Sequence, residues 1–339
     1  MKSSATAQDV ARLAKVSQSA VSRTFTPGAS VSEQTRERVT AAARALGYRP
    51  NAMARTLITG RSRIVALVMS YLENQFYPLV IEKLSQQLQG HGYHVLMFIS
   101  GKDEPDAVLS EILQYQVDAI VMASTTLSPD LAKRCADSGV PVVLFNRIPD
   151  MGTRAHQTAS TVTSDNYRGG RLVADLFVAR GHKRIAFLAG LENSSTSIER
   201  ERGLNDGLRK AGLKPYTRAV GHYQFEGAQQ AARELFRGAR RPDAVFVAND
   251  HMAIAALDVL RIELKLRVPH DVSVVGFDDV PQAAWGGYSL TTVVQDVHKM
   301  VDATVGLLLQ QIREGASPRH VVVPCRLVER QSVRPAAAG

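Results

Sequence analysis

The fold is decided near the start of the chain, where residues 6–25 read TAQDVARLAKVSQSAVSRTF. Thr6, with an acid at Asp9, is typical of a helix N-cap, and apolar residues at helical spacing follow it. Ser17 is a good N-cap for a second helix over residues 18–25. Two short helices joined by a tight turn indicate a helix-turn-helix, whose second helix enters the major groove of DNA.

A third helix is predicted directly after these two. Ser32 is its expected N-cap, the helix continues to Leu46, and Gly47 is a typical C-terminal residue. The three helices together predict a small all-α head.

The predicted base contacts lie at the start of the second helix. Gln18, Ser19 and Ala20 form its first turn, and Arg23 lies one turn later. Gln can bridge adenine, Arg can bridge guanine, and the Ala methyl suits thymine. Polar residues on the surface of a helical domain that binds no DNA would look the same, so this pattern alone leaves both interpretations open.

Most of the net charge lies in the head. The chain carries a formal charge of +9, and residues 1–63 hold eleven Lys or Arg against three Asp or Glu. That segment therefore carries +8, and the rest of the chain is nearly neutral. A solvated basic face is the plain alternative, but the helical pattern and the predominance of Arg favour a polyanionic partner.

The composition is that of a globular protein. Of 339 residues, 45% are hydrophobic and 22% are charged, which excludes disorder, collagen and coiled coil for most of the length. The longest uncharged apolar run, residues 64–72, is about half of what a membrane span needs. No secretory signal is visible, and Cys135 and Cys325 build no disulfide framework, so we expect a cytoplasmic protein.

From residue 64 onward, short β-rich runs alternate with helical stretches. The predicted strands are 64–69, 95–99, 119–122 and 142–145 in a first set, and 184–189, around 219, 244–248 and 272–276 in a second. The predicted helices are at about 77–91, 105–115, 129–138, 166–180, 198–211, 226–237 and 250–264. This alternation predicts an α/β core of two doubly wound parallel-sheet subdomains, like a periplasmic binding protein, with ligands at the carboxyl ends of the strands.

Signals for catalysis, metals and cofactors are poor. The patterns GxxxxGK[ST], GxGxxG after a strand, GxSxG and HExxH are all absent. We therefore predict no catalytic residue, no metal and no cofactor. A Rossmann-type enzyme is disfavoured because its phosphate-binding glycines are missing.

Several motifs of the head occur in a specific order. They are DVARLA at 9–14, VS at 16–17, AVSR at 20–23, VS at 31–32 and LGYRPN at 46–51. This order resembles the DNA-binding head of the LacI/GalR family of bacterial transcriptional regulators, the lactose-repressor type. The resemblance covers about fifty residues without a gap, and it implies that the head binds DNA.

The resemblance also implies a hinge helix and linker at residues 50–62. In the family, a short helix there forms when two copies pair over the minor groove, where a leucine wedges into the central base step. Leu57 matches that leucine, although an apolar linker residue packed on the body is the alternative interpretation. The predicted DNA-binding residues are Thr6, Ser17, Gln18, Ser19, Ala20, Arg23, Asn51, Ala54 and Leu57.

The body resembles the regulatory core of the same family. The matching motifs are DNYRGG at 165–170, GHKRI at 181–185, VAND at 247–250, VPHDVSVVGFDD at 268–279 and LTTV at 290–293. The resemblance implies an effector site in the cleft between two lobes. The predicted effector-binding residues are Phe76, Tyr77, Asn146, Arg200, Asn249, Asp278 and Trp285.

The chemistry of these residues suits a sugar-like ligand. Ionised Asp278 only accepts hydrogen bonds, Arg200 offers five donors, and Asn249 offers both functions. Phe76 or Tyr77 is the candidate for the flat apolar face of the site. Trp285, the only tryptophan, is equally well explained as a buried anchor or an interface residue.

The predicted organisation has four parts. They are a helix-turn-helix domain at 1–49, the hinge at 50–62, an effector-binding and dimerisation core at 63–334, and a tail at 335–339. Within the core, the N-lobe is expected at about 63–162 plus 294–321, and the C-lobe at about 163–292 plus 322–334. No leucine heptads follow the core, so we expect a homodimer and not a tetramer.

We therefore predict a sequence-specific transcriptional regulator, a repressor by its resemblance. Two symmetric heads need two symmetric half-sites, so the expected operator is palindromic double-stranded DNA. A small-molecule effector, a sugar or sugar derivative, is expected to control operator affinity. The alternative is a soluble sugar-binding module without a regulatory role. We expect no membrane partner and a location with the nucleoid in the cytoplasm.

Overall fold

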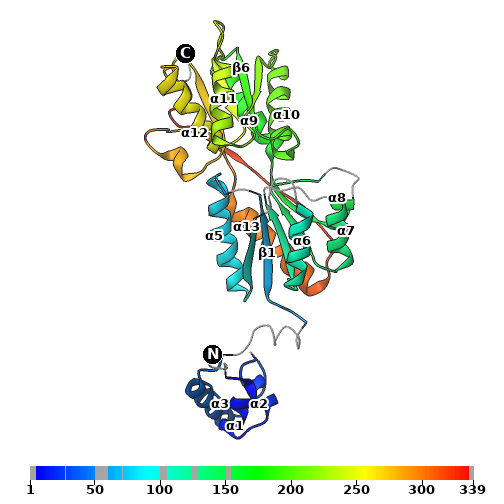
Figure 1. Ribbon diagram of the computed structural model, residues 1–339. Coiled ribbons are helices and arrows are strands. Elements are labelled where there is room, and N and C mark those ends of the chain that lie inside the picture. Colours follow the sequence, from blue (N-terminus) through cyan, green and yellow to red (C-terminus); the bar gives the residue numbers. More distant parts are fainter. Residues whose placement is uncertain are drawn as a thin grey trace. The chain divides into compact units, whose positions relative to one another are not determined.

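The computed structural model describes residues 5–26, 28–49, 60–70, 72–99, 105–123, 129–149 and 154–335. The chain divides into two compact units, Met1–Ser62 and Arg63–Gly339. Each unit is described by itself below and is drawn in Figure 1.

Unit 1 contains the three predicted helices, which are confirmed. They are α1 (Ala7–Ala14), α2 (Gln18–Thr24) and α3 (Glu33–Leu46). The caps explain these bounds. The hydroxyls of Thr6, Ser17 and Ser32 each accept a hydrogen bond from a backbone amide of the first turn of their helix. At the end of α3, Gly47 takes the left-handed conformation that favours glycine, with φ of 64°.

The head has a small core of its own. The buried side chains are Val10, Ala11, Ala14, Val21, Val39, Ala42 and Ala43. Two basic residues of α3 stabilise this packing, because Arg38 donates to the Ala14 and Lys15 carbonyls and Arg36 donates to the Thr24 carbonyl. These carbonyls lie at the C-terminal ends of α1 and α2, where backbone acceptors lack a partner within the helix.

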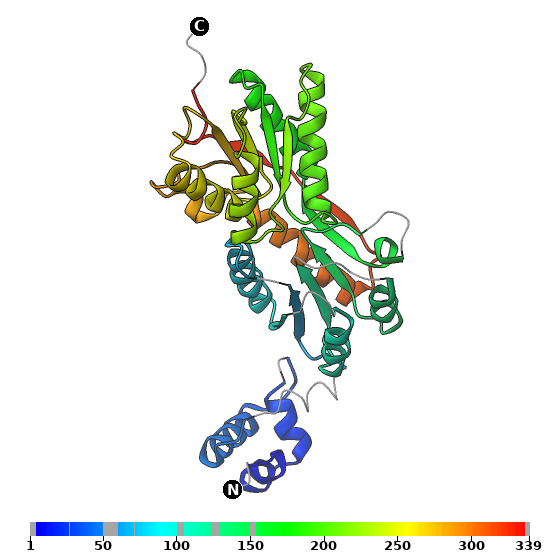
Figure 2. The same cartoon turned by 45° about the horizontal axis from the view of Figure 1, so that its top comes forward.

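The N-lobe of unit 2 is a six-stranded parallel sheet in the order β11-β5-β4-β3-β1-β2. Its strands are β1 (Ile64–Met69), β2 (His94–Ile99), β3 (Ala119–Ala123), β4 (Val142–Phe145), β5 (Ser160–Ser164) and β11 (His320–Val323). Its helices are α5 (Phe76–Gly90), α6 (Pro105–Gln114), α7 (Pro129–Asp137), α8 (Arg154–Thr158) and α13 (Val297–Glu314). Figures 1 and 2 show α5 and α13 on one face of the sheet and α6, α7 and α8 on the other.

The C-lobe is a second six-stranded sheet, in the order β12-β10-β9-β8-β6-β7, and only β12 is antiparallel. Its strands are β6 (Ile185–Ala189), β7 (Thr217–Val220), β8 (Ala244–Val247), β9 (Ser273–Asp278), β10 (Thr291–Val294) and β12 (Arg326–Val328). Its helices are α9 (Asn166–Ala179), α10 (Ser195–Lys210), α11 (Phe225–Leu235), α12 (Asp250–Asp258) and the short turns η1 (Val259–Glu263) and η2 (Pro281–Ala284). The predicted fold class, a helical head with two doubly wound lobes, is confirmed.

Three segments connect the lobes, so both lobes are discontinuous in sequence. The chain passes from one lobe to the other between β5 and α9, between β10 and α13, and between β11 and β12. These crossings fall at residues 164–166, 294–297 and 323–326. Because the strands are parallel, their carboxyl ends in both sheets lead to the junction between the lobes.

The sequence pattern did not indicate α8, β5 or β12. It missed β5 and the preceding α8, because β5 reads STVTS and its hydroxyl-rich side chains hide a fully buried strand. The hydroxyls have partners: Ser160 accepts from the Arg319 amide, and Thr161 lies 3.0 Å from His320 Nδ1. The three-residue β12 was also missed. The predicted helix at 250–264 ends at Asp258 and continues as the π-helical turn η1.

Within the described ranges, the structure contains no helix with the length and apolar character that a membrane crossing requires.

Glycines let α9 and α10 pack unusually closely. A Cβ built on Gly170 would lie 2.1 Å from the carbonyl oxygen of Arg200, and one on Gly203 would lie 2.0 Å from that of Tyr167. On the other side of α9, a Cβ on Gly169 would lie 2.4 Å from the ring of Phe277. These glycines therefore fix the distance from α9 to α10, and with it the position of Arg200 at the lobe junction.

We expect Gly203→Ala to lower the free energy of unfolding by roughly 1–3 kcal/mol, because the new methyl group overpacks the α9–α10 contact. Urea denaturation of the full chain measures this change. The matched control is Gly306→Ala in α13, where a Cβ meets nothing within 4 Å. There, helix propensity should raise stability by up to about 1 kcal/mol. Equal effects of the two substitutions would contradict the close-packing argument.

Candidate functional site

The exposed face of α2 carries the predicted base contacts. Gln18, Ser19 and Arg23 are exposed, Ala20 is half-buried, and Val21 is fully buried in the head. The polar residues therefore lie on the outer side of the helix, as a recognition helix requires.

Two other predicted DNA-binding residues act as caps. The Thr6 hydroxyl accepts from the Asp9 amide at 3.2 Å and donates to the Asp9 carboxylate at 2.7 Å. The Ser17 hydroxyl accepts from the Ala20 amide at 3.2 Å and lies 2.9 Å from that of Ser19. Three remaining predictions, Asn51, Ala54 and Leu57, lie outside the described residues, as does most of the hinge segment.

Arg200 forms the centre of a second polar site, at the lobe junction. Its side chain is 2% exposed, and its guanidinium carbon lies 3.6 Å from the centre of the Phe277 ring. Arg200 Nε donates to Asn166 Oδ1 at 2.8 Å, and Nη1 donates to the Ala248 carbonyl. Nη1 also lies 3.8 Å from Asp278 Oδ1. Arg200 thus connects α9, α10 and the ends of two strands.

Asp278 is the buried carboxylate of this site. It ends β9 with a φ of 127°, a strained backbone conformation for a residue with a side chain. Its Oδ1 accepts from Gln295 Nε2 at 2.6 Å and its Oδ2 accepts from Asn74 Nδ2 at 3.3 Å. Burial raises the pKa of Asp278 to about 6, although Arg200 acts against this.

Two asparagines follow strands of different lobes at the same junction. Asn249 comes after β8 and caps α12, because its Oδ1 accepts from the Met252 amide at 3.0 Å. Asn146 comes after β4 in the N-lobe and has a φ of 58°, which asparagine tolerates well. Both side chains are buried.

Two aromatic side chains, called the aromatic wall below, lie on the N-lobe side of the junction. Phe76 and Tyr77 begin α5, are both buried, and meet edge to face with ring centres 5.4 Å apart. Phe76 also lies 6.3 Å from the ring of Phe145. Burial raises the pKa of the Tyr77 phenol, and the charges that act on it include Arg147, Asp278 and Arg200. The phenol therefore lies among the charged groups of the site.

Several buried polar atoms of this region have no hydrogen-bond partner among the described residues. They are Asn146 Oδ1, Arg200 Nη2, Asn249 Nδ2, His251 Nε2 and Gln295 Oε1. A buried donor or acceptor without a partner costs stability, so such atoms are rare and need an explanation. Their concentration at one junction indicates a site for a ligand that offers both donors and acceptors.

A few polar contacts join the two lobes here. The Ile148 amide donates to Ser195 Oγ at 3.1 Å, and Arg147 Nη1 donates to Thr196 Oγ1 at 3.2 Å. The Asn74–Asp278 hydrogen bond is the third such contact. These hydrogen bonds are contacts between the lobes that a ligand can replace or add to.

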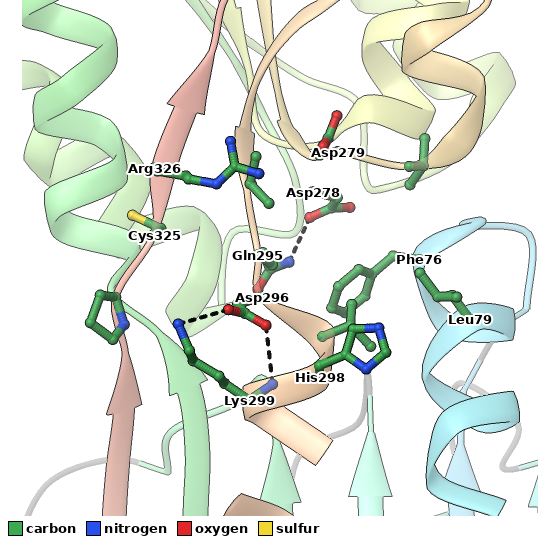
Figure 3. Close-up of a pocket in the computed structure, with 14 residues that line it drawn as sticks. Phe76, Leu79, Asp278, Asp279, Gln295, Asp296, His298, Lys299, Cys325 and Arg326 are labelled. Carbon is green, nitrogen blue, oxygen red and sulfur yellow. Dashed lines mark hydrogen bonds and ion pairs between the residues drawn. The ribbon is translucent and has the colours of Figure 1, made fainter. Parts of the chain in front are cut away.

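A pocket of about 450 Å³ lies beside the connecting segments (Figure 3). Its lining includes Phe76, Asp278, Gln295, His298, Lys299 and Arg326. It shares Phe76, Asp278 and Gln295 with the polar site, whereas Arg200, Asn146 and Asn249 do not line it. Since those three side chains are almost fully buried, we regard the pocket as the side of the same junction that lies next to the three connecting segments.

The structure brings six of the seven predicted effector residues to this junction. The exception is Trp285, which is 56% exposed after η2 and takes no part in the contacts described above. Sequence reasoning missed Asn74, Gln295 and Arg147. Gln295 directly follows β10, so the rule that ligands meet the carboxyl ends of strands could have found it.

No group of three or more His, Cys, Asp or Glu that could hold a metal ion occurs in the part of the chain that the structure describes.

Comparison with known proteins finds one matching family in each of the two units. Residues 6–51 match the family described as bacterial regulatory proteins, lacI family, and residues 174–333 match the periplasmic binding protein-like domain. The chain is 34% identical to the transcriptional regulator CelR of Thermobifida fusca, over 96% of this chain and 98% of that one. It is 29% identical to the transcriptional repressor PurR of Pectobacterium atrosepticum, over 97% of both chains.

Solved structures of similar proteins cover the same length. A CelR–cellobiose complex is 31% identical, with a TM-score of 0.73 over 97% of this chain and 99% of that one. A lac repressor dimer bound to operator and the anti-inducer ONPF is 27% identical, with a TM-score of 0.86 over the same shares.

Ionisation of Asp278 should lower the free energy of unfolding as the pH rises. Because burial raises its pKa from 3.8 to about 6, the folded chain holds this proton more tightly than the unfolded chain. The stabilising effect of this bound proton is fully present below pH 3.8 and is lost as the pH rises through about 6. We expect Asp278→Asn to gain stability relative to the parent over this range, with a slope of at most about 1.4 kcal/mol per pH unit.

Urea denaturation at a series of pH values measures the slope. Asp271→Asn is the control, because hydrogen bonds from Arg267 lower the pKa of Asp271 to about 2. Its difference from the parent should be constant above roughly pH 5. A difference for Asp278→Asn that is equally constant would contradict the raised pKa.

Proposed function

The chain belongs to the LacI family of bacterial regulatory proteins, and from that premise we propose that a sugar-like molecule between its two lobes controls its affinity for a DNA operator. The family membership makes it a DNA-binding transcriptional regulator that responds to a small molecule. The nature of the effector and the residues that bind it are the proposal.

The observation that carries the effector class is the set of unsatisfied buried polar atoms. Arg200 Nη2 and Asn249 Nδ2 are donors, whereas Asn146 Oδ1 is an acceptor. The Asp278 carboxylate adds further acceptor capacity beside them. A polyhydroxylated molecule matches this mixture because each hydroxyl both donates and accepts. The aromatic wall of Phe76 and Tyr77 suits its apolar face.

The comparison with CelR supports the same class, since a CelR structure contains cellobiose. The similarity to PurR keeps purines among the molecules to test. Of the predicted effector residues, the proposal retains Phe76, Tyr77, Asn146, Arg200, Asn249 and Asp278. Trp285 is left out because its side chain is largely exposed.

The DNA half of the proposal rests on the head. Gln18, Ser19, Ala20 and Arg23 contact base edges, while Thr6 and Ser17 fix the helix starts beside the phosphates. Asn51, Ala54 and Leu57 stay in the proposal as minor-groove residues, on the resemblance of the hinge sequence to the family.

An exposed apolar edge of the N-lobe sheet supports a homodimer. β2 is an outer strand of its sheet, and its Met97 and Ile99 are 45% and 52% exposed. Apolar side chains on an open strand edge favour association with another chain. The lac repressor structure that resembles this chain is a dimer on its operator.

Control of operator affinity requires two states that the effector binds differently. The three connecting segments let the lobes move relative to each other. The hydrogen bonds between the lobes make closure sensitive to a bound molecule. The role is that of a regulator and not of an enzyme, in keeping with the relatives. A DNA-binding regulator acts at the nucleoid, in the cytoplasm.

Selection from random duplexes with the full chain should yield an inverted repeat. On that duplex, Arg23→Ala should reduce the free-energy difference between specific and non-specific binding by about 1–3 kcal/mol, because a base contact is lost. Fluorescence anisotropy against the selected and a scrambled duplex measures this difference. Arg44→Ala, which removes an exposed charge from α3, is the control. It should weaken binding to both duplexes alike, and an equal loss of specificity in both variants would contradict the assignment of Arg23.

Asp278→Ala should abolish the response to the effector and leave operator binding intact, because the carboxylate is the main acceptor of the site. A thermal-shift panel of sugars, polyols, sugar phosphates, nucleosides and purine bases identifies the ligand. At about a hundred times its Kd, a ligand adds roughly 2.7 kcal/mol. Asp137→Ala, at an exposed position of α7, is the matched control. Stabilisation that survives Asp278→Ala would contradict the proposed site.

A further inference from the structure

Another cavity lies at the end of the C-lobe sheet that is opposite the junction. It has a volume of about 370 Å³, and its lining includes Arg184, Arg240, Arg241 and Asp271. Arg184 directly precedes β6, and Asp271 lies two residues before β9. Because the carboxyl ends of these parallel strands lead to the junction, the cavity lies at their amino ends. We call it the arginine pocket, and it is distinct from the effector site.

The carboxylates at the arginine pocket already have partners. Asp271 lines the pocket, and its Oδ1 accepts from Arg267 Nη2 at 2.6 Å and its Oδ2 from Arg267 Nε at 3.0 Å. Asp243 Oδ1 accepts from the backbone amides of Lys183 and Arg184 at 3.2 and 3.1 Å. Asp243 Oδ2 also lies 3.9 Å from Arg184 Nη2. Neither carboxylate balances the remaining arginines of the pocket.

Those remaining arginines are Arg240 and Arg241. Within the described ranges, their guanidinium groups form no ion pair and no hydrogen bond, and both side chains are exposed. Other arginines on the surface of the C-lobe have a carboxylate nearby. Arg202, Arg209 and Arg233 each lie 2.6 to 2.8 Å from one. The shortage of acids is therefore a local feature of the arginine pocket.

The backbone that carries the two unpaired arginines is held in place. Tyr216 Oη donates to the Arg240 carbonyl at 2.6 Å, and Arg184 Nε donates to the Arg241 carbonyl at 2.7 Å. The next residue, Pro242, is buried, and its ring fixes its own φ. A ligand therefore has to order the two side chains but not the loop, which lowers the entropic cost of binding.

The charges of the arginine pocket do not cancel. Four arginines and two aspartates make up the cluster, so its formal charge is +2; they are Arg184, Arg240, Arg241, Arg267, Asp243 and Asp271. A concave surface with an excess of one charge concentrates ions of the opposite charge. Arginine is especially suited to bind them, because its planar fork contacts two oxygens of a phosphate or carboxylate at once.

We propose that the arginine pocket is a second ligand site, which binds a small anion with at least two negative charges, a phosphate compound or a polycarboxylate. Arg240 and Arg241 supply the charge-assisted hydrogen bonds, and Arg184 holds the loop that carries them. The volume of about 370 Å³ lies within the range of small-molecule sites, which favours a compact anion over a nucleic-acid backbone.

The arginine pocket and the effector site lie at opposite ends of the same strands. β8 begins two residues after Pro242, and Asn249 lies two residues after its end. β9 begins two residues after Asp271 and ends at Asp278. The anion therefore stabilises the lobe that carries these effector residues without contacting the effector. This inference goes beyond the proposed function and needs no residue of the effector site.

A series of anions at constant ionic strength tests the arginine pocket. Thermal shift and isothermal titration calorimetry with the full chain compare chloride, inorganic phosphate, pyrophosphate and citrate. We expect pyrophosphate or citrate to bind roughly tenfold or more tightly than phosphate, because the larger anion reaches both unpaired arginines. The difference between pyrophosphate and citrate distinguishes a phosphate compound from a polycarboxylate.

Since the basic head also attracts anions, paired substitutions assign the site. Arg240→Gln together with Arg241→Gln should weaken binding of the tighter anion by roughly tenfold or more. The matched control is Arg313→Gln together with Arg319→Gln, which removes the same charge from exposed positions of the N-lobe. It should leave the Kd unchanged. Arg240→Lys together with Arg241→Lys keeps the charge without the fork, so it should retain part of the affinity.

Two results would overturn the inference. An equal Kd in the Arg240→Gln, Arg241→Gln variant and in its control would show that the anion binds elsewhere, the head included. If phosphate, pyrophosphate and citrate stabilise the chain no more than chloride at the same ionic strength, the pocket is only a solvated basic surface. Neither result involves the sugar-like effector, so this inference and the proposed function are tested separately.

Discussion

The position of Arg200 is the constraint on which the effector site depends. Its guanidinium carbon lies 3.6 Å from the centre of the Phe277 ring, and that ring in turn fills the space left by the missing side chain of Gly169. Gly170 and Gly203 bring α9 and α10 into backbone contact, so the helix that carries Arg200 cannot shift without losing this packing. A flexible, charged side chain is thereby held in one place by glycines and a ring, and a ligand meets a preorganised donor that it does not have to order.

Asp278 extends this constraint from one lobe to both. Its carboxylate accepts hydrogen bonds from Asn74, which belongs to the N-lobe, and from Gln295, which lies in a connecting segment. Its backbone φ of 127° lies where residues with side chains are rarely found. Such strain persists only where the surroundings hold it, and it is common at functional sites. A change in the lobe contacts therefore reaches Asp278 directly, without a long chain of intermediates.

The sequence predicted those parts of the molecule in which the local sequence signals and the packing of the folded chain favour the same structure. The head is one case, because Thr6, Ser17 and Ser32 cap the helices that their positions indicate. The strands of the lobes are another, because parallel strands such as β1 and β8 are buried on both faces and read as apolar runs. β5 was missed because its STVTS sequence is polar but buried, with hydroxyls bonded to neighbouring strands and loops. Arg147 was missed as a site residue because its burial and its contact with Thr196 of the other lobe are visible only in the fold.

The arrangement of charges explains how one site can both select a ligand and report its presence. Asp278 and Arg200 belong to the C-lobe, whereas Phe76 and Asn146 belong to the N-lobe, so a molecule that contacts all four spans the junction. Its binding energy then depends on the distance between the lobes, which is the differential affinity that a population shift requires. Reciprocity follows: if operator binding favours one lobe arrangement, it must change effector affinity by the same factor as the effector changes operator affinity. A ligand shifts the populations of two lobe arrangements only by as much as its affinities for them differ, so the contacts that it makes across the junction set the size of the response.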